Sequence, residues 1–207
     1  MYLHHPQILR AVDIARSGRL GTLELVAGSF SFTLTQPGDP RIDPGMGGGS
    51  LWDVGCYPVS FARRVAGEEP DAVDGLARFD ERGVDRTFVG QLRFPGGLLA
   101  QFDSGFAAPD RQRLEIVGRD GTLVLEAPFL SSPDGPAPTL VLRRGPDTTS
   151  LDVPSVDQYG AEVEDLTAAI LDGTPPRVTL DFSRGGIATL AELERVARGR
   201  AGLPPAR

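Results

Sequence analysis

The sequence contains no lysine and no asparagine, although it is 207 residues long. All 21 basic residues are therefore arginines, set against 28 acidic residues, and the formal net charge is −7. Without lysine, the chain has no side-chain amine to form a Schiff base or to act as a lysine general acid. The acidic balance also argues against nucleic acid as a partner, because phosphates attract a basic surface.

Cysteine, histidine and long apolar runs are scarce as well. Cys56 is the single cysteine, which excludes an internal disulfide and favours a reducing, cytoplasmic location. No apolar run approaches the ~20 residues of a membrane span, so we expect no membrane segment, and no signal peptide is apparent. His4 and His5 are adjacent and are not followed by a Cys, His or carboxylate cluster, so we expect no metal site.

The apolar pattern predicts an α+β fold (α/β by some conventions) in one domain spanning 1–207. Tight turns between consecutive strands predict an open, mostly antiparallel sheet with helices on one face. Helices are expected at 6–17, from Ser50 to just before Gly67, at 158–172 and at 182–198. Strands are expected at 21–35, 72–80, 84–94, 97–106, 111–118, 121–126, 139–144 and 149–153, with loops at 36–49 and 131–138.

Residues 41–57, RIDPGMGGGSLWDVGCY, carry the densest functional signal. A run of three glycines opens a helix, and such a run can bring the backbone close to a ligand. Ser50 and Asp53 have the spacing of a capping box. The run lacks the GxGxxG pattern and does not directly follow a strand, so it is not a dinucleotide fingerprint.

Asp53 and Tyr57 are four residues apart and therefore share one side of that helix. Pro58 removes a helical hydrogen bond and disfavours helical geometry at Tyr57. Two interpretations fit this spacing. Tyr57 is an acid/base with Asp53 as its orienting partner, or Asp53 is only a capping carboxylate and Tyr57 only a half-buried aromatic.

Several stretches resemble the C-terminal domain of the Gfo/Idh/MocA oxidoreductases, in the order that the family has them. They are MYLHHPQ (1–7), SGRLGTLELV (17–26), GGGSLWDVGCYPVSFARRVAGEEP (47–70), DERGVDRT (80–87), GRDGTLVLEAPF (118–129) and QYGAEVEDLTAAILDGTPP (158–176). The resemblance implies an open-sheet substrate domain, partnered by an N-terminal Rossmann domain that binds NAD or NADP. The reaction it implies is hydride transfer between nicotinamide and a hydroxyl-bearing carbon of a sugar, polyol or diol.

The resemblance also assigns roles to residues of this chain. The catalytic pair is Asp53 and Tyr57, and the Tyr is typical of the branch resembling glucose–fructose oxidoreductase and dihydrodiol dehydrogenase. Tyr57 would exchange a proton with the substrate hydroxyl, and Asp53 would orient it. Tyr2 and Tyr159 are candidate cofactor contacts, and Arg41 and Trp52 are candidate substrate contacts. The alternative for Tyr159 is a packed helix start, and the alternative for Trp52 is a core residue.

In the family, the Rossmann domain and a catalytic lysine lie upstream of the position of Met1. We therefore expect a truncated product that is inactive on its own and binds no nicotinamide tightly. We also expect a homodimer through the sheet face, with candidates Phe88, Leu92, Phe94, Leu99 and Phe102 for one face or the other. The alternative is a non-enzymatic lone domain for dimerisation or small-molecule binding, and the DNA upstream of Met1 would discriminate between them.

Overall fold

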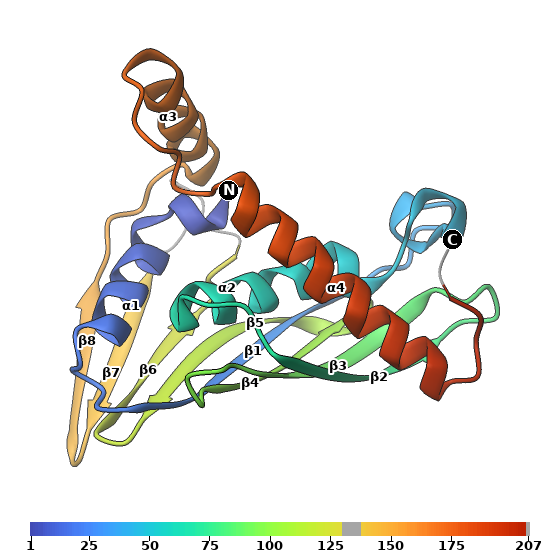
Figure 1. Cartoon of the computed structure of the whole chain (residues 1–207), viewed down its shortest axis with the longest axis horizontal. Helices are drawn as coiled ribbons and strands as arrows, with labels where there is room; N and C mark the ends of the chain where they lie inside the picture. The colour runs from blue at the N-terminus through green and yellow to red at the C-terminus, as the bar shows by residue number, and fades with distance from the viewer. Residues whose placement is uncertain (130–137, 206–207) are drawn as a thin grey trace. The chain divides into compact units, whose positions relative to one another are not determined.

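A computed structural model describes residues 1–129 and 138–205. In this part of the chain, eight strands form one mixed sheet in the order β2-β3-β4-β1-β5-β6-β7-β8, together with four α-helices (Figure 1). The predicted α+β class is therefore confirmed. The chain divides into two compact units, which are described separately. Unit 1 is Met1–Glu24 with Arg113–Arg184, and unit 2 is Leu25–Gln112 with Gly185–Arg207.

The observed elements match the predicted helices and strands to within a few residues at each end. The α-helices are α1 (Pro6–Arg16), α2 (Cys56–Ala66), α3 (Gln158–Leu171) and α4 (Leu180–Arg200). The strands are β1 (Leu23–Thr33), β2 (Ala72–Phe79), β3 (Asp85–Arg93), β4 (Leu99–Gly105), β5 (Ala107–Gly118), β6 (Gly121–Glu126), β7 (Thr139–Arg144) and β8 (Asp147–Asp152). Short 3₁₀ turns that were not predicted lie at Tyr2–His4, Pro40–Ile42 and Pro44–Met46. The loop predicted at 131–138 lies outside the described residues except for its last residue.

In unit 2, β2, β3 and β4 pair antiparallel, and β4 pairs parallel with β1. The rings of Phe88 and Phe102 stack with their centroids 5.9 Å apart on the buried face of the strands. A Cβ on Gly90 would lie 2.3 Å from the Phe102 ring, so a glycine at this position makes room for the aromatic packing. The helix α2 contributes the buried side chains Val59, Phe61, Ala62 and Val65 to this core.

The other face of these strands is mixed in polarity. Phe88, Leu92, Phe94 and Phe102 all belong to the core, and of the five candidates for the sheet faces only Leu99 is exposed. The exposed apolar side chains are Leu76, Val89 and Leu99, with Gln91 and Gln101 exposed among them. Leu76 and Val89 are direct cross-strand partners, which places two apolar side chains together on the solvent side.

In unit 1, β5, β6, β7 and β8 form an antiparallel meander. Its core is built from alternate strand residues, namely Leu114, Ile116, Leu123, Leu125, Leu140 and Leu142. The helix α1 packs against β7. His5 caps α1, because its Nδ1 accepts a hydrogen bond from the backbone N–H of Gln7 at 3.1 Å. This structural role explains a buried histidine without any metal.

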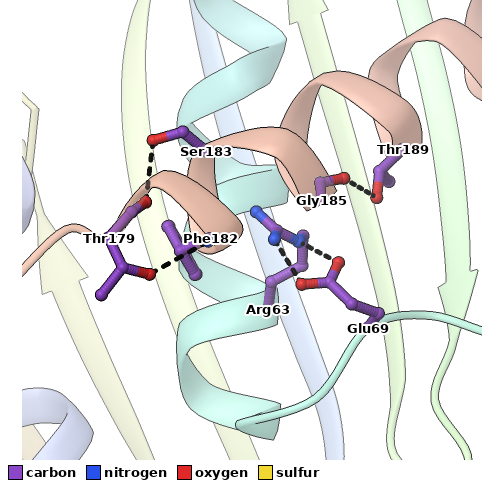
Figure 2. A network of polar contacts seen from close by, with 7 residues as sticks. All are labelled: Arg63, Glu69, Thr179, Phe182, Ser183, Gly185 and Thr189. Carbon is purple, nitrogen blue, oxygen red and sulfur yellow. Dashed lines mark hydrogen bonds and ion pairs between the residues drawn. The ribbon is translucent and has the colours of Figure 1, made fainter.

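A buried arginine ties α2 to the loop that follows it (Figure 2). Arg63 is 1% exposed, and its Nε and Nη2 donate to the two carboxylate oxygens of Glu69 at 2.7 and 2.5 Å. Gly185 of α4 lies over this ion pair, since a Cβ there would come within 2.5 Å of the Arg63 guanidinium. One turn later, Thr189 Oγ1 donates to the Gly185 carbonyl at 2.8 Å. The bidentate pair thus satisfies a charge that would be costly to bury alone.

Candidate active site

The segment carrying Asp53 and Tyr57 begins as a π-helical turn, Leu51–Gly55, and continues as α2. Pro58 has no N–H to donate to the carbonyl of Val54, which favours a wider turn at this point. The distortion falls just before Tyr57. Tyr57 itself keeps helical geometry in the first turn of α2, where a proline is tolerated, so the expected loss of helical geometry at Tyr57 is wrong.

The start of this helical segment is capped by Asp85, the first residue of β3. Its Oδ2 accepts from the Ser50 hydroxyl at 2.6 Å and from the Leu51 backbone N–H at 2.9 Å. Ser50 makes no side-chain capping bond to its own helix, so the predicted capping box of Ser50 and Asp53 is wrong. Burial raises the pKa of Asp85 to about 6, although the bonds from Ser50 and Leu51 act to lower it.

Two glycines of the run, Gly48 and Gly49, pack closely against other parts of the chain. Gly49 has a φ of +148°, and a Cβ there would lie 2.2 Å from Asp85 Oδ1. A Cβ on Gly48 would lie 2.7 Å from the carbonyl oxygen of Arg41. The close approach that glycine permits is therefore used by the Asp85 carboxylate and by the loop's own backbone. At Gly48 and Gly49 the space that a Cβ would fill is therefore taken by protein atoms, whereas at Gly47 it is open.

Tyr57 is half-buried beside an aromatic wall. Its ring meets Phe30 of β1 edge to face, with centroids 5.2 Å apart and an interplanar angle of 81°. Phe32 continues the wall and packs against Phe106 at 5.3 Å. Edge-to-face packing of this kind restricts how the phenol ring can turn. The position of the Tyr57 ring is thus set by β1 as well as by α2.

Arg41 brings a positive charge to the same region. Its guanidinium lies 5.6 Å from the centre of the Phe32 ring, and its Nε donates to Asp39 Oδ1 at 3.1 Å. Burial raises the pKa of Asp53, the charge of Arg41 lowers it, and Asp39 raises it further. The charge of Arg41 thus reaches Asp53, and Arg41 lies over Phe32, which is the neighbour of the Phe30 ring that contacts Tyr57.

Trp52 faces a different environment. Its indole N–H donates to Glu194 Oε2 of α4 at 2.8 Å. The ring lines a cavity of about 530 Å³ whose other walls include Arg82, Asp85 and Arg198. Neither Asp53 nor Tyr57 belongs to that lining. The structure thus separates the surroundings of Trp52 from those of the Asp53 and Tyr57 pair.

The two candidate cofactor contacts both lie in unit 1 and differ in exposure. Tyr2 is buried at 4% exposure, with its ring edge to face on Phe129 at 5.4 Å. Tyr159 is 59% exposed in the first turn of α3, and its backbone N–H donates to the N-cap residue Asp157 at 3.0 Å. Their role toward a cofactor stays a prediction.

Cys56 precedes Tyr57, but its thiol is unreactive as a nucleophile. Burial, and then the charge of Asp53, raise the pKa of its thiol to about 12. The thiolate is the reactive form, so Cys56 is no nucleophile near neutral pH.

The described ranges contain neither a metal-binding cluster nor a membrane-spanning helix. Within 1–129 and 138–205, no group of three or more His, Cys, Asp or Glu side chains could hold a metal ion. No helix in those ranges combines the length and apolar character that crossing a membrane requires.

Comparison with known proteins places this geometry in a family. Residues 8–124 match the family model of the GFO/IDH/MocA C-terminal domain. The D-xylose 1-dehydrogenase (NADP(+)) 2 of Haloferax volcanii is 37% identical over 186 residues, which is 88% of this chain and 56% of the relative. The uncharacterized oxidoreductase ORF334 of Rhizobium meliloti is 32% identical over 199 residues, or 93% of this chain and 59% of the relative. The chain thus spans less than two thirds of the length of these relatives.

Solved structures agree with the sequence matches. The aldose–aldose oxidoreductase of Caulobacter crescentus, crystallised with glycerol, superposes with a TM-score of 0.87 at 26% identity. It covers 96% of this chain, which in turn matches 60% of that chain. KijD10, a 3-ketoreductase from Actinomadura kijaniata crystallised with NADP and TDP-benzene, has a TM-score of 0.82 at 26% identity. The match covers 98% of this chain and 61% of KijD10.

Proposed function

Since the chain belongs to the GFO/IDH/MocA family and carries its C-terminal domain, we propose that it forms the substrate side of an NAD(P)-dependent sugar oxidoreductase. Relatives with this domain are NADP-dependent oxidoreductases of sugars and related compounds. The observation that supports the proposal is that Tyr57 begins α2 directly after the π turn that carries Asp53, and that the charge of Arg41 reaches Asp53. We propose a sugar, polyol or diol hydroxyl as the reacting group.

In this proposal Tyr57 is the acid/base that exchanges a proton with the substrate hydroxyl. A free tyrosine has a pKa of ~10, so reaching neutral pH requires ~4 kcal/mol of differential stabilisation of the phenolate. A nearby cation is the usual source of such stabilisation, and Arg41 is the cation whose charge reaches Asp53. Asp53 and the Phe30 wall then hold the hydroxyl and the ring in position.

The glycine run is not assigned to the cofactor, because Gly49 packs on the Asp85 carboxylate and Gly48 on the Arg41 carbonyl. Nicotinamide, when bound in the family's enzymes, supplies the hydride chemistry that side chains lack. The steps assigned to this chain are binding the hydroxyl, orienting it and moving its proton. We accordingly propose that these 207 residues alone show no turnover.

An assay of a fusion enzyme tests this function. The fusion joins the chain to the part of KijD10 that lies outside the match, and it is supplied with NADP⁺ and a panel of aldoses, polyols and diols. We expect NADPH formation by the fusion and none by the 207 residues alone. A fusion that binds NADP⁺ but oxidises no member of the panel would refute the proposed function, and turnover by the isolated chain would refute the need for a cofactor domain.

We also propose that two copies associate through the exposed face of β2, β3 and β4. Val89 is half-exposed at the centre of this face, opposite Leu76. Val89→Arg should convert the dimer to a monomer in light scattering, because it buries an unpaired charge in the interface. Glu81→Arg, which adds the same side chain at the turn between β2 and β3, should leave the dimer intact. A wild-type chain that is monomeric at 50 to 100 μM would rule out this interface.

A further inference from the structure

The cavity of about 530 Å³ beside Trp52 has no part in the proposed reaction. Every residue that lines it belongs to unit 2, and neither Asp53 nor Tyr57 is among them. Its volume lies within the range of small-molecule sites in proteins. Trp52 is a predicted substrate contact that lines this cavity, so a ligand contact of Trp52 would be made here and not at Tyr57.

Part of the cavity wall is apolar and rigid. It consists of one indole and three proline rings, namely Trp52, Pro44, Pro204 and Pro205. The indole is held in place because its N–H donates to Glu194 Oε2 at 2.8 Å. The segment with Pro204 is held against α4, since Arg198 Nε donates to the Pro204 carbonyl at 2.7 Å. Preorganised flat surfaces of this kind suit the C–H face of a ring-shaped ligand.

Charged side chains on the same wall have hydrogen-bonding capacity that the described residues do not use. Arg198 donates from Nε and Nη1, and Arg82 donates from Nη2 to the Ile42 carbonyl. Among the described residues, no hydrogen bond involves Arg198 Nη2 or Arg82 Nη1. Glu194 Oε1 lies 3.6 Å from Arg198 Nη1, which is longer than a hydrogen bond, so this oxygen can accept one from a ligand. The cavity therefore offers donors and an acceptor together.

The charges of the lining balance one another. Its two arginines are matched by two carboxylates, those of Asp85 and Glu194. An ionic ligand would lose its hydration here without meeting a net opposite charge. A hydroxyl group is neutral and both donates and accepts hydrogen bonds, so the hydroxyls of one ring can use the arginines and Glu194 together.

We propose that this cavity binds a neutral sugar or cyclic polyol, with its ring on the face of Trp52 and its hydroxyls on Arg82 and Glu194. The ligand site goes beyond the proposed function, because Asp53 and Tyr57 do not form it and it needs no cofactor. Binding there can therefore be measured on the 207-residue chain without turnover.

Trp52 is the only tryptophan of the sequence, so its fluorescence reports directly on this cavity. The probe is methyl α-D-glucopyranoside, added at pH 8, where Asp85, with a pKa of about 6, is ionised. We expect a saturable change in Trp52 emission with a Kd of roughly 1–10 mM, which is typical of a small neutral ligand with few contacts. Glycine and sodium acetate are the ionic controls, and they should bind at least about tenfold more weakly.

Two variants test the assigned contacts. Arg82→Ala removes an exposed side chain of the wall. Glu194→Gln keeps an oxygen for the Trp52 indole but replaces the other carboxylate oxygen with an amide N–H. Each should weaken binding of the glucoside at least about tenfold, the loss typical of one hydrogen bond to a charged group. Arg78→Ala is the matched control, since Arg78 is exposed on β2 outside the lining, and its affinity should stay within about twofold.

Tyr57→Phe shows whether the glucoside binds in the cavity or at the proposed catalytic pair. It leaves the cavity lining intact, so the fluorescence titration should not change, and loss of the titration would overturn the proposal. Undiminished binding by Arg82→Ala or Glu194→Gln, each checked for folding by circular dichroism, would overturn it as well. So would equal affinity for glycine or acetate, or no saturable change up to about 100 mM glucoside. None of these results bears on the proposed function, which is tested by turnover of the fusion enzyme.

Discussion

Replacing Tyr57 with phenylalanine in the fusion enzyme should lower kcat by about 10²-fold or more, which is the contribution typical of a positioned acid/base. The substitution removes only the hydroxyl, and the ring can keep its edge-to-face contact with Phe30 at 5.2 Å. KM should change little, because the acid/base role of the hydroxyl stabilises the transition state and not the bound substrate. Steady-state kinetics over pH 6–10 checks this, and the variant should also lose the rising limb that an ionising phenol gives.

The control for this prediction is Ser60→Ala. Ser60 lies one turn further along α2, and its hydroxyl donates to the carbonyls of Cys56 and Tyr57 at 2.6 and 3.0 Å. Its loss tests whether small changes in this helix are enough to reduce the rate, and we expect kcat within about threefold of the wild type. If Tyr57→Phe keeps near-normal turnover, Tyr57 has no part in proton transfer.

The second large effect concerns stability and pH. Asp85 is 6% exposed, and its pKa is raised from 3.8 to about 6, chiefly by burial. Between these values the folded state binds more protons than the unfolded state, so stability falls as pH rises. The contribution is complete below pH 4 and is lost by about pH 7. Because the pKa of Asp85 rises from 3.8 to about 6, the unfolding free energy lost over this pH range is about 3 kcal/mol.

Asp85→Asn should remove this pH-dependent loss. The amide oxygen can still accept from the Ser50 hydroxyl and the Leu51 N–H, but it does not ionise. Urea unfolding of the 207-residue chain at pH 4, 5, 6 and 7 measures the difference between the two curves. Asp13→Asn, at an exposed position of α1, should retain the wild-type decline. Parallel curves for the wild type and Asp85→Asn would contradict the assignment.

The sequence predicts the regular elements well because their signals are local. Apolar periodicity and Gly or Pro punctuation are enough to place α1, β6 and β7 almost residue for residue. The π turn at Leu51–Gly55 is harder to foresee. Pro58 indicates that the helix is disturbed. Whether the helix breaks or widens there depends on contacts with residues of β3, which are far from Pro58 in the sequence.

The same limit applies to the candidate site. The spacing of Asp53 and Tyr57 is visible in the sequence, as is the nearby Arg41. Asp85 is not, since its partners Ser50 and Leu51 are 35 and 34 residues away. Its one sequence signal is the stretch DERGVDRT at 80–87, which belongs to the family resemblance but assigns no role to the aspartate. Hydrogen bonds between residues so far apart in the sequence can be identified only from the three-dimensional structure.

The π turn has a consequence for how this segment tolerates insertions and deletions. A π turn accommodates one residue more than the α-helical turn that it replaces. Removing one residue from Leu51–Gly55 would restore a regular helix with little rotation, whereas adding one residue would rotate everything before the insertion by about 100° relative to α2. The capped end at Asp85 and the aromatic wall at Phe30 could not both keep their partners after such a rotation. The segment between Ser50 and Tyr57 should therefore tolerate the loss of one residue better than the gain of one.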